Sequence, residues 1–271
     1  MSIAHGSTAP LLDRGTKLDA GAWITYYPTA LEGSVVGGTV ATREGESPRA
    51  WHRRDVGESD AGRRPVATKD EPSSTERLER ANRRARGQVR RYCTANAVQR
   101  LLTLTYRPPQ PVDVAVVRRD VTRFLRRLRA DRPDLAYVWT LERHKSGALH
   151  VHVGLGSGGS KLSPERLSWL WGHGFIDIRK IRAKGRRASA RVVAVYLAKY
   201  VTKESARLDG GHRYDVREGR QPDVVRAAAV VLADGLSQLL RLAGGEVPAY
   251  VWTSGELVDW RGPPVAFVSW D

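Results

Sequence analysis

Two short motifs carry the side chains whose types and spacing point to chemistry. His150 and His152 are separated by one residue, and Tyr196 and Tyr200 follow later in the chain, four residues apart. Alternate side chains of a strand share a face, and so do helical residues four apart. A metal held by the histidines would polarise a phosphate, and a tyrosine oxygen would attack it. Together the motifs predict phosphodiester chemistry.

A third metal ligand is expected on the strand that precedes His150. The pattern predicts strands over 136–142 and 148–155, joined as a hairpin. A three-residue turn at Lys145–Gly147 would place Glu142 opposite His150, whereas a turn one residue longer or shorter would move it to the other face. Two imidazoles and one carboxylate suit Mg²⁺ or Mn²⁺ with an oxygen-rich substrate, and ligand type alone also allows Zn²⁺ or Co²⁺. The alternative is a packed pair of polar histidines without a metal.

The tyrosine segment has a nested pattern, because each tyrosine has a lysine three residues after it. These lysines are Lys199 and Lys203. A free phenol has a pKa near 10 and is a poor nucleophile at neutral pH, but ammonium groups and a metal favour the phenolate. A phosphotyrosine would keep the energy of the phosphodiester, so the cut strand could be rejoined. Two tyrosines on one face could cut twice in succession. The alternative is an ordinary amphipathic helix whose tyrosines lie at the edge of the hydrophobic core.

Charge makes nucleic acid the leading partner. The 271 residues have a net charge of +16, and most of the basic residues are arginines, which contact phosphate with two hydrogen bonds. Seven arginines fall between Arg77 and Arg91. A solvated helix face and a GC-rich genome are the alternative reasons for such a run. The predicted DNA contacts are Arg83, Arg84, Arg86, Arg90, Arg91, Arg107, Arg182, Lys184, Arg186 and Arg187.

Other classes of protein are disfavoured. The sequence has no apolar run long enough to cross a membrane and no secretory signal at its start, so a cytoplasmic location and no membrane partner are expected. The single cysteine, Cys93, excludes an internal disulfide and a cysteine-rich zinc site.

The chain is expected to have three parts. Residues 1–73 are predicted to be a flexible or weakly structured segment with one possible strand, 22–27. Residues 74–205 are predicted to be the catalytic domain, led by a basic helix over 74–98. Residues 206–271 form an accessory region of unassigned role, with a helix over 224–242 and strands over 247–252 and 265–270.

The catalytic part has the predicted order β-α-β-β-α-β-α. Its remaining elements are a strand over 101–106, a helix over 113–129, a short helix from 163 to 172, a strand over 175–181, a basic loop over 182–187 and a helix over 189–203. This order predicts an α+β fold of the ferredoxin-like type, with a central antiparallel sheet and helices packed on it.

The histidine and tyrosine motifs resemble those of the HUH endonuclease superfamily, and in particular those of the two-tyrosine initiators of rolling-circle replication in plasmids and small circular-DNA phages. Leu102–Tyr106 matches the first motif of that family, Glu142 with His150-Val151-His152 the second, and Tyr196–Lys203 the third. The resemblance implies a palm-like antiparallel sheet and a divalent-metal nuclease. Such an enzyme nicks single-stranded or hairpin origin DNA, becomes attached to the 5′-phosphate and leaves a 3′-hydroxyl for the host polymerase. We expect Tyr196 to attack first.

Other partners and functions stay open. The sequence lacks a Gly-x-x-x-x-Gly-Lys-Ser/Thr motif, so a host helicase is expected to act with the protein. A transposase or conjugative relaxase would use the same chemistry. A DNA-binding replication-control protein without catalysis would bind equally well in EDTA or after Tyr→Phe changes. A cupin-like metal enzyme also uses His-x-His but needs neither basic charge nor paired tyrosines.

Overall fold

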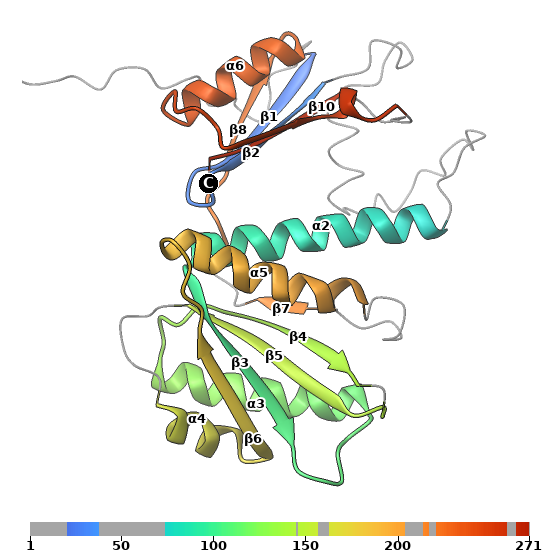
Figure 1. Cartoon of the computed structure of the whole chain (residues 1–271), viewed down its shortest axis with the longest axis vertical. Coiled ribbons are helices and arrows are strands. Elements are labelled where there is room, and N and C mark those ends of the chain that lie inside the picture. The colour runs from blue at the N-terminus through green and yellow to red at the C-terminus, as the bar shows by residue number, and fades with distance from the viewer. Residues whose placement is uncertain are drawn as a thin grey trace, which may run out of the picture. The chain divides into compact units, whose positions relative to one another are not determined.

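The computed structural model describes residues 21–37, 74–144, 146–156, 163–203, 214–216, 221–258 and 264–270. The chain divides into two compact units, one of Thr68–Pro222 and one of Met1–Ala67 with Asp223–Asp271. Each unit contains a five-stranded antiparallel sheet with helices packed on it (Figure 1). The predicted α+β class is confirmed. Within the described ranges, no helix combines the length and apolarity that a membrane crossing needs.

The larger unit is built on a ferredoxin-like arrangement of strands and helices. Its sheet has the order β6-β3-β5-β4-β7. Helix α3 connects β3 to β4, a hairpin joins β4 to β5, and α4 connects β5 to β6, which is the split β-α-β pattern expected from the sequence. The elements are β3 (Val98–Tyr106), α3 (Val114–Asp131), β4 (Tyr137–Arg143), β5 (Leu149–Gly156), α4 (Pro164–Trp171), β6 (Gly174–Lys180) and β7 (Tyr214–Val216).

Local sequence explains where these helices begin and end. The side chain of Asp113 accepts a hydrogen bond from the backbone N–H of Ala115 and caps α3. Ser163 caps α4 in the same way, and Gly172 ends that helix in the left-handed conformation that glycine adopts most easily. The apolar residues of α3 recur at helical spacing and are buried against the sheet.

The two faces of this sheet have separate cores. On one face, α3 and α4 cover the apolar side chains of β3, β4 and β5. On the other face lie α2 (Ser74–Ala95) and α5 (Arg186–Lys203) (Figure 1). The two helices contact each other through small and aliphatic residues. These residues include Ala85, Val89, Val193, Ala194 and Leu197. His150 and His152 alternate with Val151 and Val153, which face α3, so both histidines belong to the face covered by α5.

The smaller unit combines strands from the beginning and the end of the chain. Its sheet has the order β8-β1-β2-β10-β9, with α6 packed on one face. The elements are β1 (Ala22–Tyr27), β2 (Glu32–Gly37), β8 (Val225–Ala229), α6 (Leu232–Leu242), β9 (Tyr250–Thr253), the 3₁₀ turn η2 (Ser254–Glu256) and β10 (Val265–Ser269).

Several sequence expectations need correction here. The strand expected over 22–27 is present as β1, but residues 32–37 were not expected to form a strand. Both β1 and β2 form because they pair with β8 and β10 from the distant end of the chain. The rest of 1–73 lies outside the described residues. The helix expected over 224–242 is instead the strand β8 followed by α6, and Arg186 and Arg187 begin α5 rather than a basic loop. The unit that contains β7 also extends beyond residue 205.

Gly154 controls how closely α5 approaches the sheet. A Cβ atom at this position would lie 2.8 Å from Val98 Cγ1 and 2.9 Å from Leu197 Cδ1. We predict that Gly154→Ala lowers the free energy of unfolding by about 1–3 kcal/mol, the usual effect of overpacking a core. Urea unfolding followed by circular dichroism would measure this change.

Gly87→Ala is the matched control in α2. A Cβ atom there meets only the flexible Arg91 side chain, with its Nη1 at 3.1 Å. Because alanine favours the helix, this variant should gain about 0.5–1 kcal/mol. Equal stabilities for the two variants would contradict the close packing of α5 on β5.

Candidate active site

The hairpin of β4 and β5 brings the three predicted metal ligands onto one face. The turn closes through a hydrogen bond from the His144 N–H to the Ala148 carbonyl, 2.8 Å long, and Glu142 pairs directly with His150. The register that the sequence predicted from a three-residue turn is therefore confirmed. The Nε2 atom of His152 lies 2.9 Å from Oε2 of Glu142.

Two threonines of the neighbouring strand β3 fix the histidine rings. The Oγ1 atom of Thr103 lies 3.2 Å from Nδ1 of His152, and Oγ1 of Thr105 lies 3.3 Å from Nδ1 of His150. A hydroxyl can donate or accept a hydrogen bond, so each threonine accommodates either tautomer of its histidine. Both threonines alternate with buried leucines, a pattern that places them on the histidine face, yet sequence reasoning gave them no role in the site.

Both tyrosines lie against His152. The ring of Tyr200 stacks on the imidazole with centroids 4.4 Å apart, and the ring of Tyr196 meets it edge-on at 5.3 Å. The Tyr200 hydroxyl donates a hydrogen bond to the Tyr196 oxygen, 3.1 Å away. Tyr200 is buried and Tyr196 is half-buried. The structure thus brings the two motifs found in the sequence together at one point.

A third histidine adjoins the site from the hairpin turn. The ring of His144 stacks on that of His150 with centroids 4.6 Å apart. Sequence analysis singled out only the His-x-His pair, because a histidine in a turn has no spacing that marks it.

The environment keeps the imidazoles neutral. Burial lowers the pKa of both His150 and His152, and the neighbouring His144 lowers the pKa of His150 further. For His152, the hydrogen bond to Glu142 acts in the opposite direction but does not outweigh burial. A neutral imidazole is the form that can give a lone pair to a cation.

The donor types and their partners suit a divalent cation. With Nδ1 of each ring contacting a threonine, Nε2 is the nitrogen through which each ring would bind a metal, and this is the usual arrangement around metal-binding histidines. Across the described ranges, however, no three His, Cys, Asp or Glu side chains are grouped as a metal site would require. Here Glu142 contacts His152 directly by a hydrogen bond instead.

The predicted lysines are placed in part. Lys199 is exposed, with Nζ 5.6 Å from the centre of the Tyr200 ring. Lys203 is the last residue of α5, and its side chain lies outside the described residues.

The predicted DNA-contacting residues lie in three places. Arg107 follows β3 and lies over the ring of Phe175, 5.6 Å from its centre. A second group is exposed at the opposite end of α5 from the tyrosines and consists of Arg182, Lys184, Arg186 and Arg187. At a rise of about 1.5 Å per residue, Arg186 lies about 15 Å along the helix from Tyr196. The third group lies along α2, with Arg83, Arg84 and Arg86 exposed and Arg90 and Arg91 half-buried.

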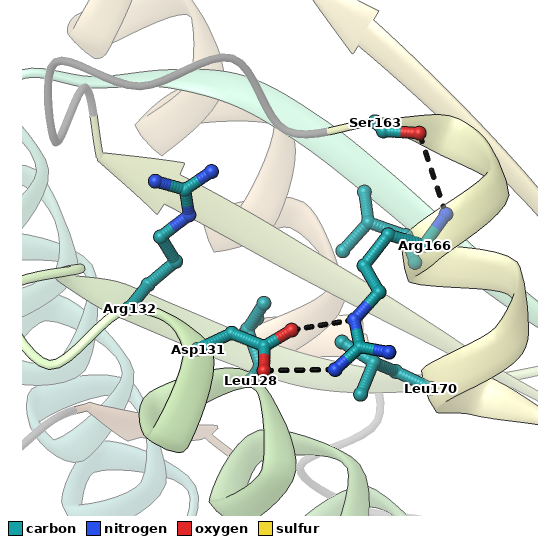
Figure 2. Close-up of a pocket in the computed structure, with 7 residues that line it drawn as sticks. Leu128, Asp131, Arg132, Ser163, Arg166 and Leu170 are labelled. Carbon is teal, nitrogen blue, oxygen red and sulfur yellow. Dashed lines mark hydrogen bonds and ion pairs between the residues drawn. The ribbon is translucent and has the colours of Figure 1, made fainter.

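A surface pocket lies elsewhere in this unit, between the end of α3 and the start of α4 (Figure 2). Arg166 donates two hydrogen bonds to Asp131, of 2.6 and 2.9 Å, and holds the pKa of that carboxyl below its usual value. None of the predicted site residues lines this pocket, and its two helices cover the face opposite His152. The ion pair joins α3 to α4.

The Tyr200 phenol should resist ionisation in the metal-free protein. Burial raises its pKa, and so do the hydrogen bond to Tyr196 and the charge of Glu142. We predict that the difference between wild-type and Tyr200→Phe spectra shows no phenolate absorbance below about pH 10, the pKa of a free tyrosine. Ionisation near neutral pH in an ultraviolet titration would contradict this environment.

Comparison with known proteins agrees with the position of the site. Residues 99–205 match the model of a family described as "Replication-associated protein ORF2". The matched range contains β3 to α5, and so the histidines, both tyrosines and the threonines. No curated protein and no solved structure matches the chain. This part of the chain is therefore similar to replication-associated proteins.

Proposed function

We propose that this protein nicks and rejoins single-stranded origin DNA through a 5′-phosphotyrosine intermediate and so starts rolling-circle replication, as a two-tyrosine member of the HUH superfamily. The observation that carries the proposal is the contact of both tyrosine rings with His152, which itself bonds to Glu142. Nucleophile and candidate metal ligands thus share one point on one face. The match of residues 99–205 to a replication-associated family supports the biological setting.

Tyr196 is the better first nucleophile. The residue is half-buried whereas Tyr200 is buried, so a DNA strand reaches Tyr196 more easily. Its oxygen accepts the hydrogen bond that the Tyr200 hydroxyl donates, so Tyr200 helps to orient it. Tyr200 then serves in a second transfer.

The reaction is a transesterification. The Tyr196 hydroxyl releases its proton to solvent as its oxygen attacks the scissile phosphorus, a new O–P bond forms, and the bond from phosphorus to the 3′ oxygen breaks. The leaving 3′ oxygen takes up a proton and becomes the primer end, while the 5′-phosphate stays on the tyrosine. Attack by the freed 3′-hydroxyl reverses these steps and rejoins the strand. Lys199, exposed beside the Tyr200 ring, would offset the phosphate charge.

Glu142, His150 and His152 would hold a divalent cation, Mg²⁺ or Mn²⁺. When bound, it would supply positive charge at the phosphate oxygens. Thr103 and Thr105 would then accept hydrogen bonds from the Nδ1–H groups and hold both rings in the orientation that the cation needs.

Tyrosine substitution tests the covalent step. We expect wild-type protein with Mn²⁺ to form an SDS-resistant complex with labelled single-stranded oligonucleotides that tile its replicon. The Tyr196→Phe/Tyr200→Phe variant should form none, although its rings still pack on His152. Tyr137→Phe on β4, whose ring belongs to the core on the opposite face of the sheet from the histidines, is the control and should behave as wild type.

The outcomes separate the candidate functions. If the protein binds DNA in EDTA but forms no covalent complex with any oligonucleotide of the replicon, the result would favour a non-catalytic control protein and reject the proposal. Cleavage only at transposon ends or at a transfer origin would keep the chemistry and assign it to a transposase or relaxase.

Threonine substitution tests the metal site. We expect Thr105→Val to weaken Mn²⁺ binding about 10- to 100-fold, as measured by calorimetry, because the His150 ring loses the partner of its Nδ1. Thr94→Val in α2 removes a hydroxyl that bonds within its own helix and should leave Mn²⁺ affinity unchanged. Equal affinity in all three proteins would contradict the assignment of these ligands.

A further inference from the structure

One row of side chains leads from the candidate active site to the edge of the sheet. Glu142 on β4 is opposite His150 on β5, His150 contacts Thr105 on β3, and Thr105 is opposite Phe175 on β6. Opposed residues of antiparallel strands project from the same face. Phe175 therefore shares the face of the histidines. Its strand lies two strand spacings from that of His150, about 10 Å.

Phe175 is an exposed aromatic ring at this edge. Its exposed fraction is 61%, whereas its neighbours Ile176 and Ile178 pack against the core on the other face. A single exposed apolar side chain needs no functional explanation. Here, however, the Arg107 guanidinium lies over the ring, 5.6 Å from its centre, so a flat apolar surface and a cation occur together beside the site.

The segment that carries Arg107 is firmly held. The Arg107 N–H donates to the His173 carbonyl, and the Trp171 indole donates to the Thr105 carbonyl, at 3.0 and 3.1 Å. Between them, the buried Tyr106 packs edge-on against Trp171. The backbone of β3 thus has a fixed position where it passes from the histidine partner Thr105 to Arg107.

The charges along the edge strand do not oppose an anion at this place. Asp177, the next residue of β6 on this face, accepts a hydrogen bond from Arg179 at 2.8 Å, which offsets its charge. Arg107, Arg179 and Lys180 are all exposed at the ends of these two strands.

We propose that Phe175 and Arg107 form a nucleotide subsite beside the scissile phosphate: a base of the single strand stacks on the Phe175 ring, and Arg107 pairs with the adjoining backbone phosphate. The subsite rests on the proposed function. It adds to that function the position at which the DNA strand leaves the catalytic centre. Aromatic stacking accepts any base, so the subsite contributes affinity and position rather than sequence choice.

The test is binding of a fluorescein-labelled oligothymidylate to the full chain, measured by anisotropy. EDTA and the Tyr196→Phe/Tyr200→Phe background prevent cleavage during the measurement. We expect Phe175→Ala to weaken binding about tenfold, within the range that stacking of one base contributes, and Phe175→Trp to restore it. Arg107→Ala should reduce the slope of log affinity against log salt by about 0.7, the value for one phosphate of a single strand, whereas Phe175→Ala should leave that slope unchanged.

Trp169 provides a matched control. It is 66% exposed and has the Arg166 guanidinium 4.3 Å from its ring centre, but α4 packs on the opposite face of the sheet. Trp169→Ala should bind as the parent does. Unchanged affinity in Phe175→Ala, an equal loss in Trp169→Ala, or a parent that does not bind the oligonucleotide would each overturn the subsite. Because nicking is measured separately, normal binding without any covalent complex would reject the enzyme and leave the subsite standing.

Discussion

The site depends on the contact between the Tyr200 and His152 rings, which lie 4.4 Å apart. These rings come from a helix and a strand that are distant in the sequence, so the contact exists only because α5 lies close to β5. Gly154 permits this approach, since a Cβ atom there would collide with Leu197 of α5. A bulkier residue would displace the helix and separate the tyrosines from the histidines. The packing of one glycine thereby sets the distance between nucleophile and candidate metal ligands.

The sheet supplies the other half of the geometry. The face toward α3 and α4 is built from apolar strand residues, whereas the face toward α5 combines a second core, which includes Val98 and Val138, with the polar side chains of the site. Glu142, His150, Thr105 and Phe175 follow each other across four strands on that second face. Backbone pairing fixes the strand positions. The short side chains of the two threonines on β3 are therefore sufficient to orient the imidazoles.

Local patterns predicted much of the larger unit and of its site. The turn before Ala148 fixed the register of Glu142, and the spacing of Tyr196 and Tyr200 predicted their shared helix face; both depend on residues near in sequence. Long-range pairing was not predictable in this way. The glycine-rich β2 was missed as a strand, and the alanine-rich β8 resembled a helix, because their strand character comes from partners far along the chain. The interactions of Thr103, Thr105 and His144 likewise required the assembled sheet.

The most direct test of the central claim is to locate the DNA adduct by mass spectrometry. Trypsin cuts after Arg191, Lys199 and Lys203, so it places Tyr196 and Tyr200 in separate peptides, 192–199 and 200–203. After reaction of the wild-type protein with single-stranded origin DNA and Mn²⁺, followed by nuclease digestion, the account predicts a nucleotide joined through phosphate to Tyr196 in peptide 192–199. An adduct on neither tyrosine, in a reaction that has cleaved the DNA, would contradict it.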